Sequence, residues 1–212
     1  MLPLFLERAR MEEFKLYSVS DEYIEYLRKV FPNVYPRAHR NAGPSGGWTS
    51  SIKVYSNKET TRIHTRKYVG IVLCLGNYHY YIPMSSPKES DYQIAGEKKV
   101  IRKSIVPIMR IVVKNSKGQK ELKGTLRISH MIPVPQSELL LYDIENEQDC
   151  TYKDLVQNEI IFIRKNQEKI YANANLLYKQ KTENDLSAGY VRAALEYKEL
   201  EKLCRDFIAE NK

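Results

Sequence analysis

The sequence has few cysteines and lacks the motifs that hold metals and nucleotides. Cys74, Cys150 and Cys204 are far apart and form no CxxC pair or Cys/His ligand spacing. This scattered set predicts a reducing compartment without structural disulfides or zinc, with Cys74 and Cys204 buried as small hydrophobic residues. No Walker loop, GxGxxG, HExxH, GxSxG or magnesium-binding acidic pair is present. Metal-dependent nuclease chemistry therefore lacks its ligands, and we expect no metal and no cofactor.

Long hydrophobic runs are also missing. No stretch approaches the roughly 18 consecutive apolar residues of a membrane helix, so we expect a soluble cytoplasmic protein without a membrane partner. The apolar start has no basic region before it and does not resemble a secretion signal. We expect residues 1–10 to be a disordered tail and residues 11–212 to form a single domain.

Negative charge is scarce in the middle of the chain. Residues 37–127 contain 18 Lys and Arg against 5 Asp and Glu, whereas the rest of the chain is net negative and the total is +8. Segregated positive charge is typical of a protein that follows a phosphate backbone. A basic surface with no partner is the alternative interpretation.

Two paired strands are predicted at the centre of the chain. Residues 69–75 form an almost unbroken apolar run, Gly76-Asn77 is a two-residue hairpin signal, and residues 78–84 are rich in strand-forming aromatics. Further strands are expected at 14–18, on both sides of Pro107 within 100–113, and at 126–132, with a short apolar element at 137–144 and a polar crossing at 89–97.

Helices are predicted near both ends of the sequence. Ser20 is a candidate N-cap for a helix that ends at Phe31, because Pro32 disfavours helical geometry in the preceding residue. Thr151 and Asp154 resemble a capping box before a helix of six or seven turns that continues to about Leu177. A final helix is expected at about 190–208.

The candidate catalytic residues lie at the end of the second central strand. Pro83-Met84-Ser85-Ser86-Pro87-Lys88 brings two hydroxyls and an ammonium together, with Arg66 and Lys67 at the other end of the paired strands. Such groups can orient the 2′-hydroxyl of RNA and neutralise a phosphorane without metal. His64, His79 and His130 also lie in the basic middle, and a histidine is suited to proton transfer at neutral pH. A plain β-turn is the structural alternative for the Ser-Ser-Pro-Lys segment.

Four blocks of sequence resemble the ToxN/AbiQ family of type III toxin–antitoxin endoribonucleases, which includes CptN-like toxins. They are 14–18 with 23–27, 68–73, 81–88 and His130-Met131-Ile132-Pro133-Val134-Pro135, and residues 152–157 and 163–166 are also similar to the family's helical end. The resemblance implies an α+β fold, a strongly twisted antiparallel β-sheet core packed with helices and similar to Kid/MazF-type toxins.

The resemblance also implies a bacterial phage-defence function. Members of the family cleave single-stranded RNA, cellular or phage mRNA, to 2′,3′-cyclic phosphate and 5′-hydroxyl ends without metal. They are inhibited by a repeated RNA pseudoknot antitoxin that the toxin processes, in a closed heteromeric protein–RNA assembly.

By position, the resemblance assigns catalytic roles to Ser86, Ser85 and Lys88. Arg66, with Lys67 beside it, stands where the family has a lysine, and an arginine can hold a phosphate but cannot act as a general acid or base. The tyrosine that some relatives carry four residues earlier has no counterpart, because Arg62 occupies that place. The residues expected to bind RNA are Arg37, Arg40, Trp48, Lys53, Arg62, His64, Lys98, Lys99, Arg102 and Lys103. Trp48 either stacks on a base or anchors a long loop.

Two other function classes are considered beside the nuclease. The basic middle would suffice for a non-catalytic RNA- or DNA-binding module. A transcriptional autorepressor is disfavoured, because no helix-turn-helix with a basic recognition helix is evident.

Overall fold

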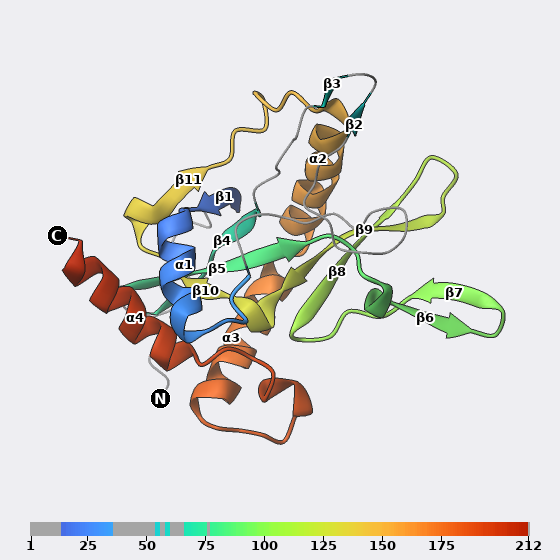
Figure 1. Ribbon diagram of the computed structural model, residues 1–212. Helices are drawn as coiled ribbons and strands as arrows, with labels where there is room; N and C mark the ends of the chain where they lie inside the picture. Colours follow the sequence, from blue (N-terminus) through green and yellow to red (C-terminus); the bar gives the residue numbers. More distant parts are fainter. Residues whose placement is uncertain (1–13, 36–53, 56–57, 60–65, 76, 212) are drawn as a thin grey trace.

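The fold is α+β, with a mainly antiparallel sheet between helices (Figure 1). The computed structural model describes residues 14–35, 54–55, 58–59, 66–75 and 77–211. Within these residues, seven strands form the main sheet in the order β11-β1-β4-β5-β9-β8, with β10 also paired to β5. Their bounds are β1 Lys15–Val19, β4 Tyr68–Leu75, β5 Tyr78–Ser85, β8 Ile108–Lys114, β9 Lys120–Arg127, β10 Ile132–Pro133 and β11 Leu139–Leu141.

The predicted central hairpin is confirmed as β4 and β5. Antiparallel pairing runs from Leu75↔Tyr78 at the turn to Tyr68↔Pro83. A Cβ on Gly70 would lie 2.0 Å from the ring of Tyr81, so only glycine allows that ring to lie across the sheet. The last residues of β5 pair with β9, which makes β5 the strand that joins the two halves of the sheet.

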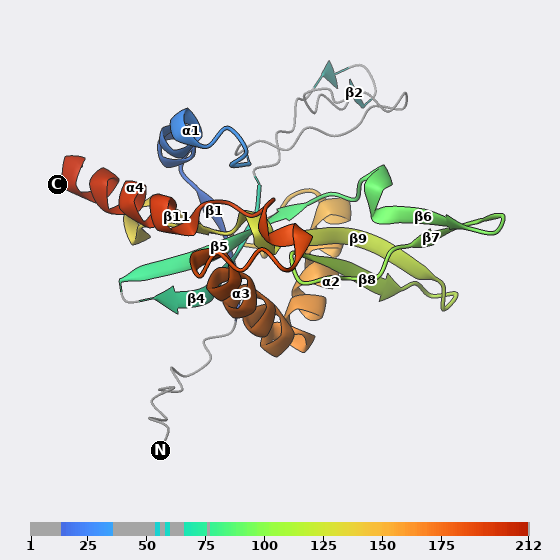
Figure 2. The ribbon, with the colours of Figure 1, turned by 90° about the horizontal axis from the view of Figure 1, so that it is seen from below.

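The first helix, α1 (Asp21–Val30), begins and ends as predicted. The Ser20 hydroxyl accepts the Tyr23 backbone N–H, and Phe31 is the C-cap before Pro32. Tyr23, Ile24 and Leu27 form its buried face. Figure 2 shows α1 on one side of the sheet and α3 on the other.

The C-terminal helices differ from their predicted bounds. One long helix was expected, but α2 (Cys150–Lys165) and α3 (Gln167–Thr182) are separated at Asn166, whose side-chain amide donates to the Phe162 carbonyl. The N-cap of α2 is Asp149, whose carboxylate accepts the Tyr152 N–H, so the predicted Thr151 capping box is wrong. The last helix, α4 (Tyr197–Glu210), begins seven residues after the predicted start, following the short η4 turn Gly189–Val191.

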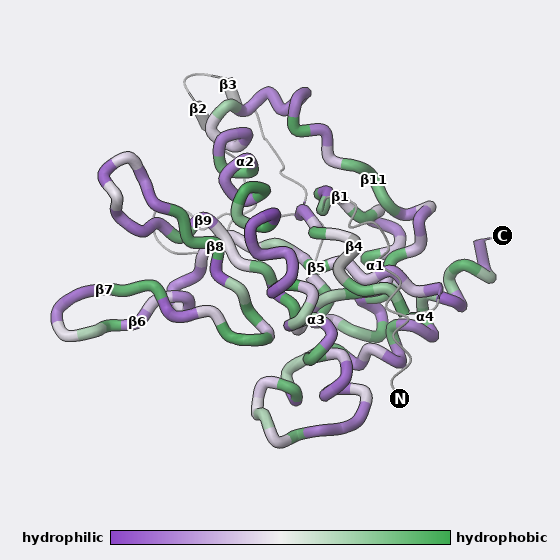
Figure 3. Tube along the Cα trace, turned by 180° about the vertical axis from the view of Figure 1, so that it is seen from behind, coloured by the Kyte–Doolittle hydropathy of each residue, from purple (hydrophilic) through white to green (hydrophobic). Residues whose placement is uncertain are grey.

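Polar strands account for the other differences. Most of the expected polar crossing is the η1 turn Glu89–Asp91 followed by β6 (Tyr92–Ala95), which pairs with β7 (Lys98–Ile101). Strand β9 begins at Lys120, six residues before the predicted strand, and ends in the η2 turn Ile128–His130. The β6–β7 hairpin extends away from the main sheet, with hydrophilic residues at its turn (Figure 3).

Two further short strands, β2 (Val54–Tyr55) and β3 (Lys58–Glu59), pair with each other, and the short η3 turn is Gln136–Glu138.

The core between the sheet and the C-terminal helices contains a buried carboxylate. Glu201 of α4 accepts hydrogen bonds from the hydroxyls of Tyr80 at 2.9 Å and Tyr178 at 2.7 Å. Cys204 is buried nearby on the same helix, as predicted. The prediction that Cys74 is buried is wrong, because it pairs with the exposed His79 near the end of the β4–β5 hairpin and is itself exposed.

Candidate active site

The candidate site begins with the side chains on one face of β5, β8 and β9. Ser85 is the partner of Thr125, and Thr125 is the partner of Arg110. Directly paired residues of antiparallel strands project on the same face, so these three side chains share one. The Cβ direction of Gly124 meets the side chain of Glu159 on α2, so the adjacent Thr125 faces away from that helix. The shared face is therefore the one opposite α2.

Arg66 lies two residues before the start of β4, and its side chain reaches the same face. The Met84 N–H donates to the Lys67 carbonyl, which extends the β4–β5 pairing and places Arg66 opposite Ser85. The expectation that Arg66 and Lys67 lie at the other end of the paired strands is therefore wrong, because antiparallel pairing brings the start of β4 beside the end of β5. The Arg66 guanidinium donates to the Met84 carbonyl at 2.6 Å. Arg66 is only 6% exposed, and this burial lowers its pKa. The charge of Arg66 is thus fixed beside the end of β5.

Tyr35, which follows α1, joins the cations of this face. The Arg66 guanidinium carbon lies 4.5 Å from the centre of the Tyr35 ring, and the Lys88 ammonium lies 5.6 Å from it. Both distances are within the range of cation–π attraction. The ring also stacks on His130, with 4.7 Å between ring centres and 28° between planes. Four segments that are distant in sequence therefore meet at one aromatic ring.

The ionisation of the cluster is strongly perturbed. Burial, with the charges of Arg127, Lys88 and Arg66, lowers the pKa of His130 to about 4. Burial is also the main cause that lowers the pKa of Lys88, followed by the repulsion of Arg127 and Arg66. His130 is consequently neutral at physiological pH, while the surrounding cations give the site a positive field.

Asp91 provides the counter-charge. Its carboxylate is fully buried, pairs with Arg110 at 3.1 Å and Arg127 at 3.3 Å, and accepts the backbone N–H of Lys88 at 3.0 Å. A buried carboxylate with two hydrogen-bond donors and a second ion pair holds its surroundings in one arrangement. Asp91 therefore fixes the turn that carries Ser86 and Lys88.

The two serines occupy different environments. Ser86 is exposed, whereas Ser85 is buried and its hydroxyl donates to the Ser86 carbonyl at 3.2 Å. Ser86 is thus the hydroxyl that a bound polymer can reach, and Ser85 stabilises the backbone beneath it.

Lys67 is not part of this cluster. Adjacent residues of an extended chain project on opposite faces, and the Lys67 ammonium lies 3.8 Å from the centre of the Tyr142 ring. The structure brings together Ser85, Lys88 and Arg66 from the predicted catalytic set, with Ser86 between them in the chain, and directs Lys67 elsewhere.

The structure describes four of the residues that were predicted to bind RNA. They lie on the β6–β7 hairpin and directly after it. Lys98, Lys99, Arg102 and Lys103 are all exposed. Lys99 pairs with Glu89 at 2.7 Å, and Arg102 donates to the Tyr92 carbonyl at 2.9 Å. The other predicted contacts, Arg37, Arg40, Trp48, Lys53, Arg62 and His64, lie outside the described residues, as do residues 1–10.

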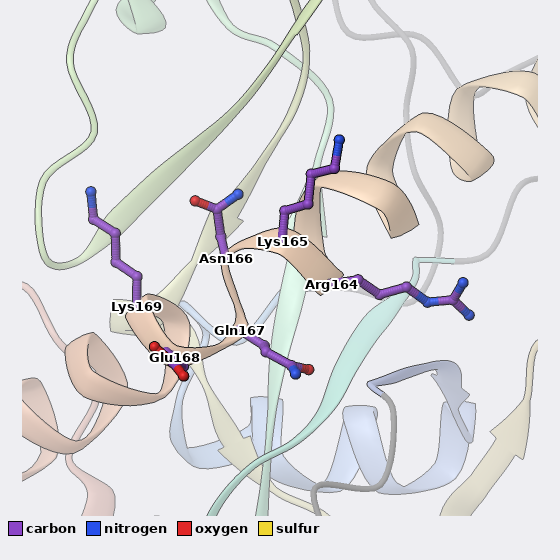
Figure 4. Close-up of a pocket in the computed structure, with 6 residues that line it drawn as sticks. All are labelled: Arg164, Lys165, Asn166, Gln167, Glu168 and Lys169. Atoms are coloured by element: carbon purple, nitrogen blue, oxygen red, sulfur yellow. The ribbon is translucent and has the colours of Figure 1, made fainter.

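A separate pocket lies at the α2–α3 junction, where Arg164, Lys165 and Lys169 form much of its lining (Figure 4). Among the residues described, no group of three or more His, Cys, Asp or Glu is arranged to hold a metal ion. No helix in the described ranges is both long and apolar enough to span a membrane.

Comparison with known proteins places the chain in a family. A model for toxin ToxN of type III toxin–antitoxin systems matches residues 49–205, about three-quarters of the sequence. The chain belongs to the ToxN family. It is 24% identical to endoribonuclease ToxN of Pectobacterium atrosepticum, over 91% of this chain and 93% of that protein. It is 25% identical to endoribonuclease AbiQ of Lactococcus lactis subsp. lactis, over 95% of this chain and 93% of that protein.

Solved structures have the same fold. The structure of AbiQ, described as a lactococcal anti-phage endoribonuclease, has a TM-score of 0.65 at 23% identity, over 92% of this chain and 98% of AbiQ. A structure from a type III system, described as showing selective toxin inhibition by a non-coding RNA pseudoknot, has a TM-score of 0.63 at 19% identity, with the same coverage. The predicted family and α+β fold class are therefore confirmed for this ToxN-family chain.

The sequence alone did not identify every residue of the site. Tyr35, Asp91 and Arg127 carry no local motif, and their contacts arise only when separate segments meet. In the sequence, His130 is one of three histidines of the basic middle and part of a family block, with no role of its own. Only the contact with Tyr35 distinguishes it from the others.

Proposed function

We propose that this ToxN-family protein is an endoribonuclease toxin that cleaves single-stranded RNA at the end of β5. The observation that carries the proposal is the convergence of Lys88 and the buried Arg66 at the Tyr35 ring, with the exposed Ser86 two residues before Lys88 in the chain. The names of the relatives as endoribonucleases support the same activity.

The proposed reaction uses the 2′-hydroxyl of the RNA as the nucleophile. Ser86 contacts this hydroxyl or the scissile phosphate, Ser85 supports Ser86, and Lys88 and Arg66 stabilise the pentacovalent phosphate. Attack by the adjacent oxygen gives a 2′,3′-cyclic phosphate and a 5′-hydroxyl, and the substrate's own nucleophile makes the reaction independent of metal. Lys67 has no role in this arrangement, because its side chain contacts Tyr142 instead.

The proposed inhibitor is a repeated RNA pseudoknot that the toxin processes from its precursor. The solved relative described as inhibited by an RNA pseudoknot supports this partner. The exposed basic residues of the β6–β7 hairpin are available to bind phosphates, and the assembly is proposed to be a closed heteromeric complex in the bacterial cytoplasm. Cellular or phage mRNA is the proposed substrate, and residues 11–212 the proposed single domain.

The test is cleavage of single-stranded RNA in EDTA by purified, RNA-free protein. Wild type, Ser86→Ala and the matched control Ser90→Ala are compared, because Ser90 is also exposed and lies only four residues away. We expect Ser86→Ala to lose roughly 10²-fold or more in rate and Ser90→Ala to remain as active as wild type. RNA binding without cleavage by wild type would instead identify a non-catalytic RNA-binding module.

A further inference from the structure

The η2 turn holds an imidazole in a fixed position beside the proposed site. The Ser129 N–H donates to the Pro107 carbonyl at 3.2 Å, and the Ser129 carbonyl accepts the Leu195 N–H at 3.1 Å. The Tyr197 hydroxyl donates to the Ile128 carbonyl at 3.4 Å. Because the loop before β8 and the segment that leads into α4 both hold this turn, His130 is presented from a rigid part of the fold.

The ring of His130 lies within the cationic cluster. It stacks on Tyr35, which also contacts Arg66 and Lys88. From this geometry we infer that His130 is a further catalytic residue, the base that removes the proton of the attacking 2′-hydroxyl. The inference rests on the proposed RNA cleavage.

The orientation of the ring assigns a role to each nitrogen. The Ser129 hydroxyl oxygen lies 3.0 Å from Nδ1 of His130. In the tautomer that a base requires, Nδ1–H donates to this hydroxyl and Nε2 presents its lone pair to the substrate. A neighbouring group that orients a catalytic imidazole in this way is a common feature of acid–base sites.

The surroundings of the ring keep it in the neutral form that a base requires. The groups that face it are Arg127 from β9, Lys88 after β5, Arg66 before β4, Tyr35 after α1 and Ser129 of its own turn, and Asp91 is paired with Arg127. These charges and burial hold the pKa of His130 near 4, so the ring is unprotonated at neutral pH and its lone pair is available. Protonation of His130 places an imidazolium next to three cations, which repel it. The negative charge that develops on the phosphorane offsets this repulsion, so proton transfer is linked to the transition state.

The step balances as a transesterification. The proton of the 2′-hydroxyl moves to Nε2, and the bond between the 2′-oxygen and phosphorus forms while the bond to the 5′-oxygen breaks. The leaving 5′-oxygen takes a proton from the Lys88 ammonium, whose lowered pKa makes it a stronger acid than an ordinary lysine. Water then removes the proton from His130 and returns one to Lys88.

The test compares His130→Gln with His79→Gln, an exposed histidine at the other end of β5. Single-turnover cleavage is measured at saturating RNA from pH 4 to pH 8, and affinity is measured with RNA that carries a 2′-O-methyl group at the cleavage site. We expect His130→Gln to be roughly 10²- to 10⁴-fold slower with affinity within threefold of wild type. The wild-type rate should fall as pH approaches 4, and this fall should be absent from the variant. His79→Gln should behave as wild type.

A second variant separates a chemical role from a folding defect. His130→Asn retains an amide that can donate to Ser129 but has no basic nitrogen. This variant should therefore fold and bind RNA, but its single-turnover cleavage should be as slow as that of His130→Gln. Either variant that cleaves within threefold of wild type, loses only affinity, or keeps the acid limb would overturn the inference. If wild type does not cleave RNA at all, the proposed function fails instead, and the two failures are distinguishable.

Discussion

Glu159 of α2 is a buried carboxyl whose replacement should stabilise the protein. The Glu159 side chain packs against β9, where a Cβ on Gly124 would lie 2.5 Å from Oε1 of Glu159. Glu159 is only 8% exposed. Among the described residues, burial is the only cause that acts on the pKa of this carboxyl, and no hydrogen bond or neighbouring charge contributes to it. Burial raises the pKa of Glu159 from 4.5 to about 8. The folded protein therefore retains a proton that the unfolded chain releases above pH 4.5.

The size of the effect follows from linkage. Between pH 4.5 and pH 8 the folded state binds more protons than the unfolded state, so stability falls as pH rises. One pH unit in this window corresponds to about 1.4 kcal/mol, so the loss at pH 7 is about 3 kcal/mol. Glu159→Gln resembles the protonated acid in shape and cannot ionise. It should raise the free energy of unfolding by about 3 kcal/mol at pH 7 and change it little at pH 4.5.

Urea denaturation at several pH values measures this difference. The matched control is Glu201→Gln, a second buried glutamate whose carboxylate accepts hydrogen bonds from two tyrosine hydroxyls. That substitution should destabilise the protein by about 1–3 kcal/mol, because it weakens a satisfied network. A Glu159→Gln variant that is less stable at pH 7, or whose gain does not depend on pH, would refute the reasoning.

Three further predictions concern the site and the hairpin. Asp91→Ala leaves Arg110 and Arg127 buried without their carboxylate and should cost about 3–5 kcal/mol in urea denaturation, so near wild-type stability would contradict the ion-pair account. Tyr35→Ala removes the ring that contacts two cations and should slow single-turnover cleavage by about tenfold. Tyr35→Phe keeps the ring and should cleave at the wild-type rate. Equal losses in the two variants would assign the effect to the hydroxyl. Replacing Lys98, Lys99 and Lys103 together by Gln should lower the salt dependence of single-stranded RNA binding by about 2 in the log–log slope, and an unchanged slope would mean that the hairpin does not bind phosphate.

The features that were predictable have local causes. The Gly76-Asn77 signal between two apolar runs predicts a hairpin, and Ser20 and Pro32 delimit α1. Antiparallel pairing brings Arg66, which was expected at the other end of the paired strands, opposite Ser85. Local chemistry therefore predicts the hairpin and the bounds of α1.

The features that were missed depend on contacts between distant segments. Strand β9 begins with the polar residues Lys120 and Glu121, which become part of a strand by pairing with β8, and β6 is stabilised by β7 in the same way. The break between α2 and α3 has no proline or glycine, so periodicity continued through it. Asp91, Tyr35 and His130 acquire their roles only by tertiary contact, which no spacing rule records.

The chemical identity of the RNA product ends tests the central claim most directly. Wild-type protein is incubated with single-stranded RNA in EDTA, and the ends on each side of the mapped cut are identified by mass spectrometry. Attack by the 2′-hydroxyl at the cluster around Ser86, Lys88 and Arg66 predicts a 2′,3′-cyclic phosphate and a 5′-hydroxyl. A 3′-hydroxyl with a 5′-phosphate would show that water is the nucleophile, and it would contradict the account.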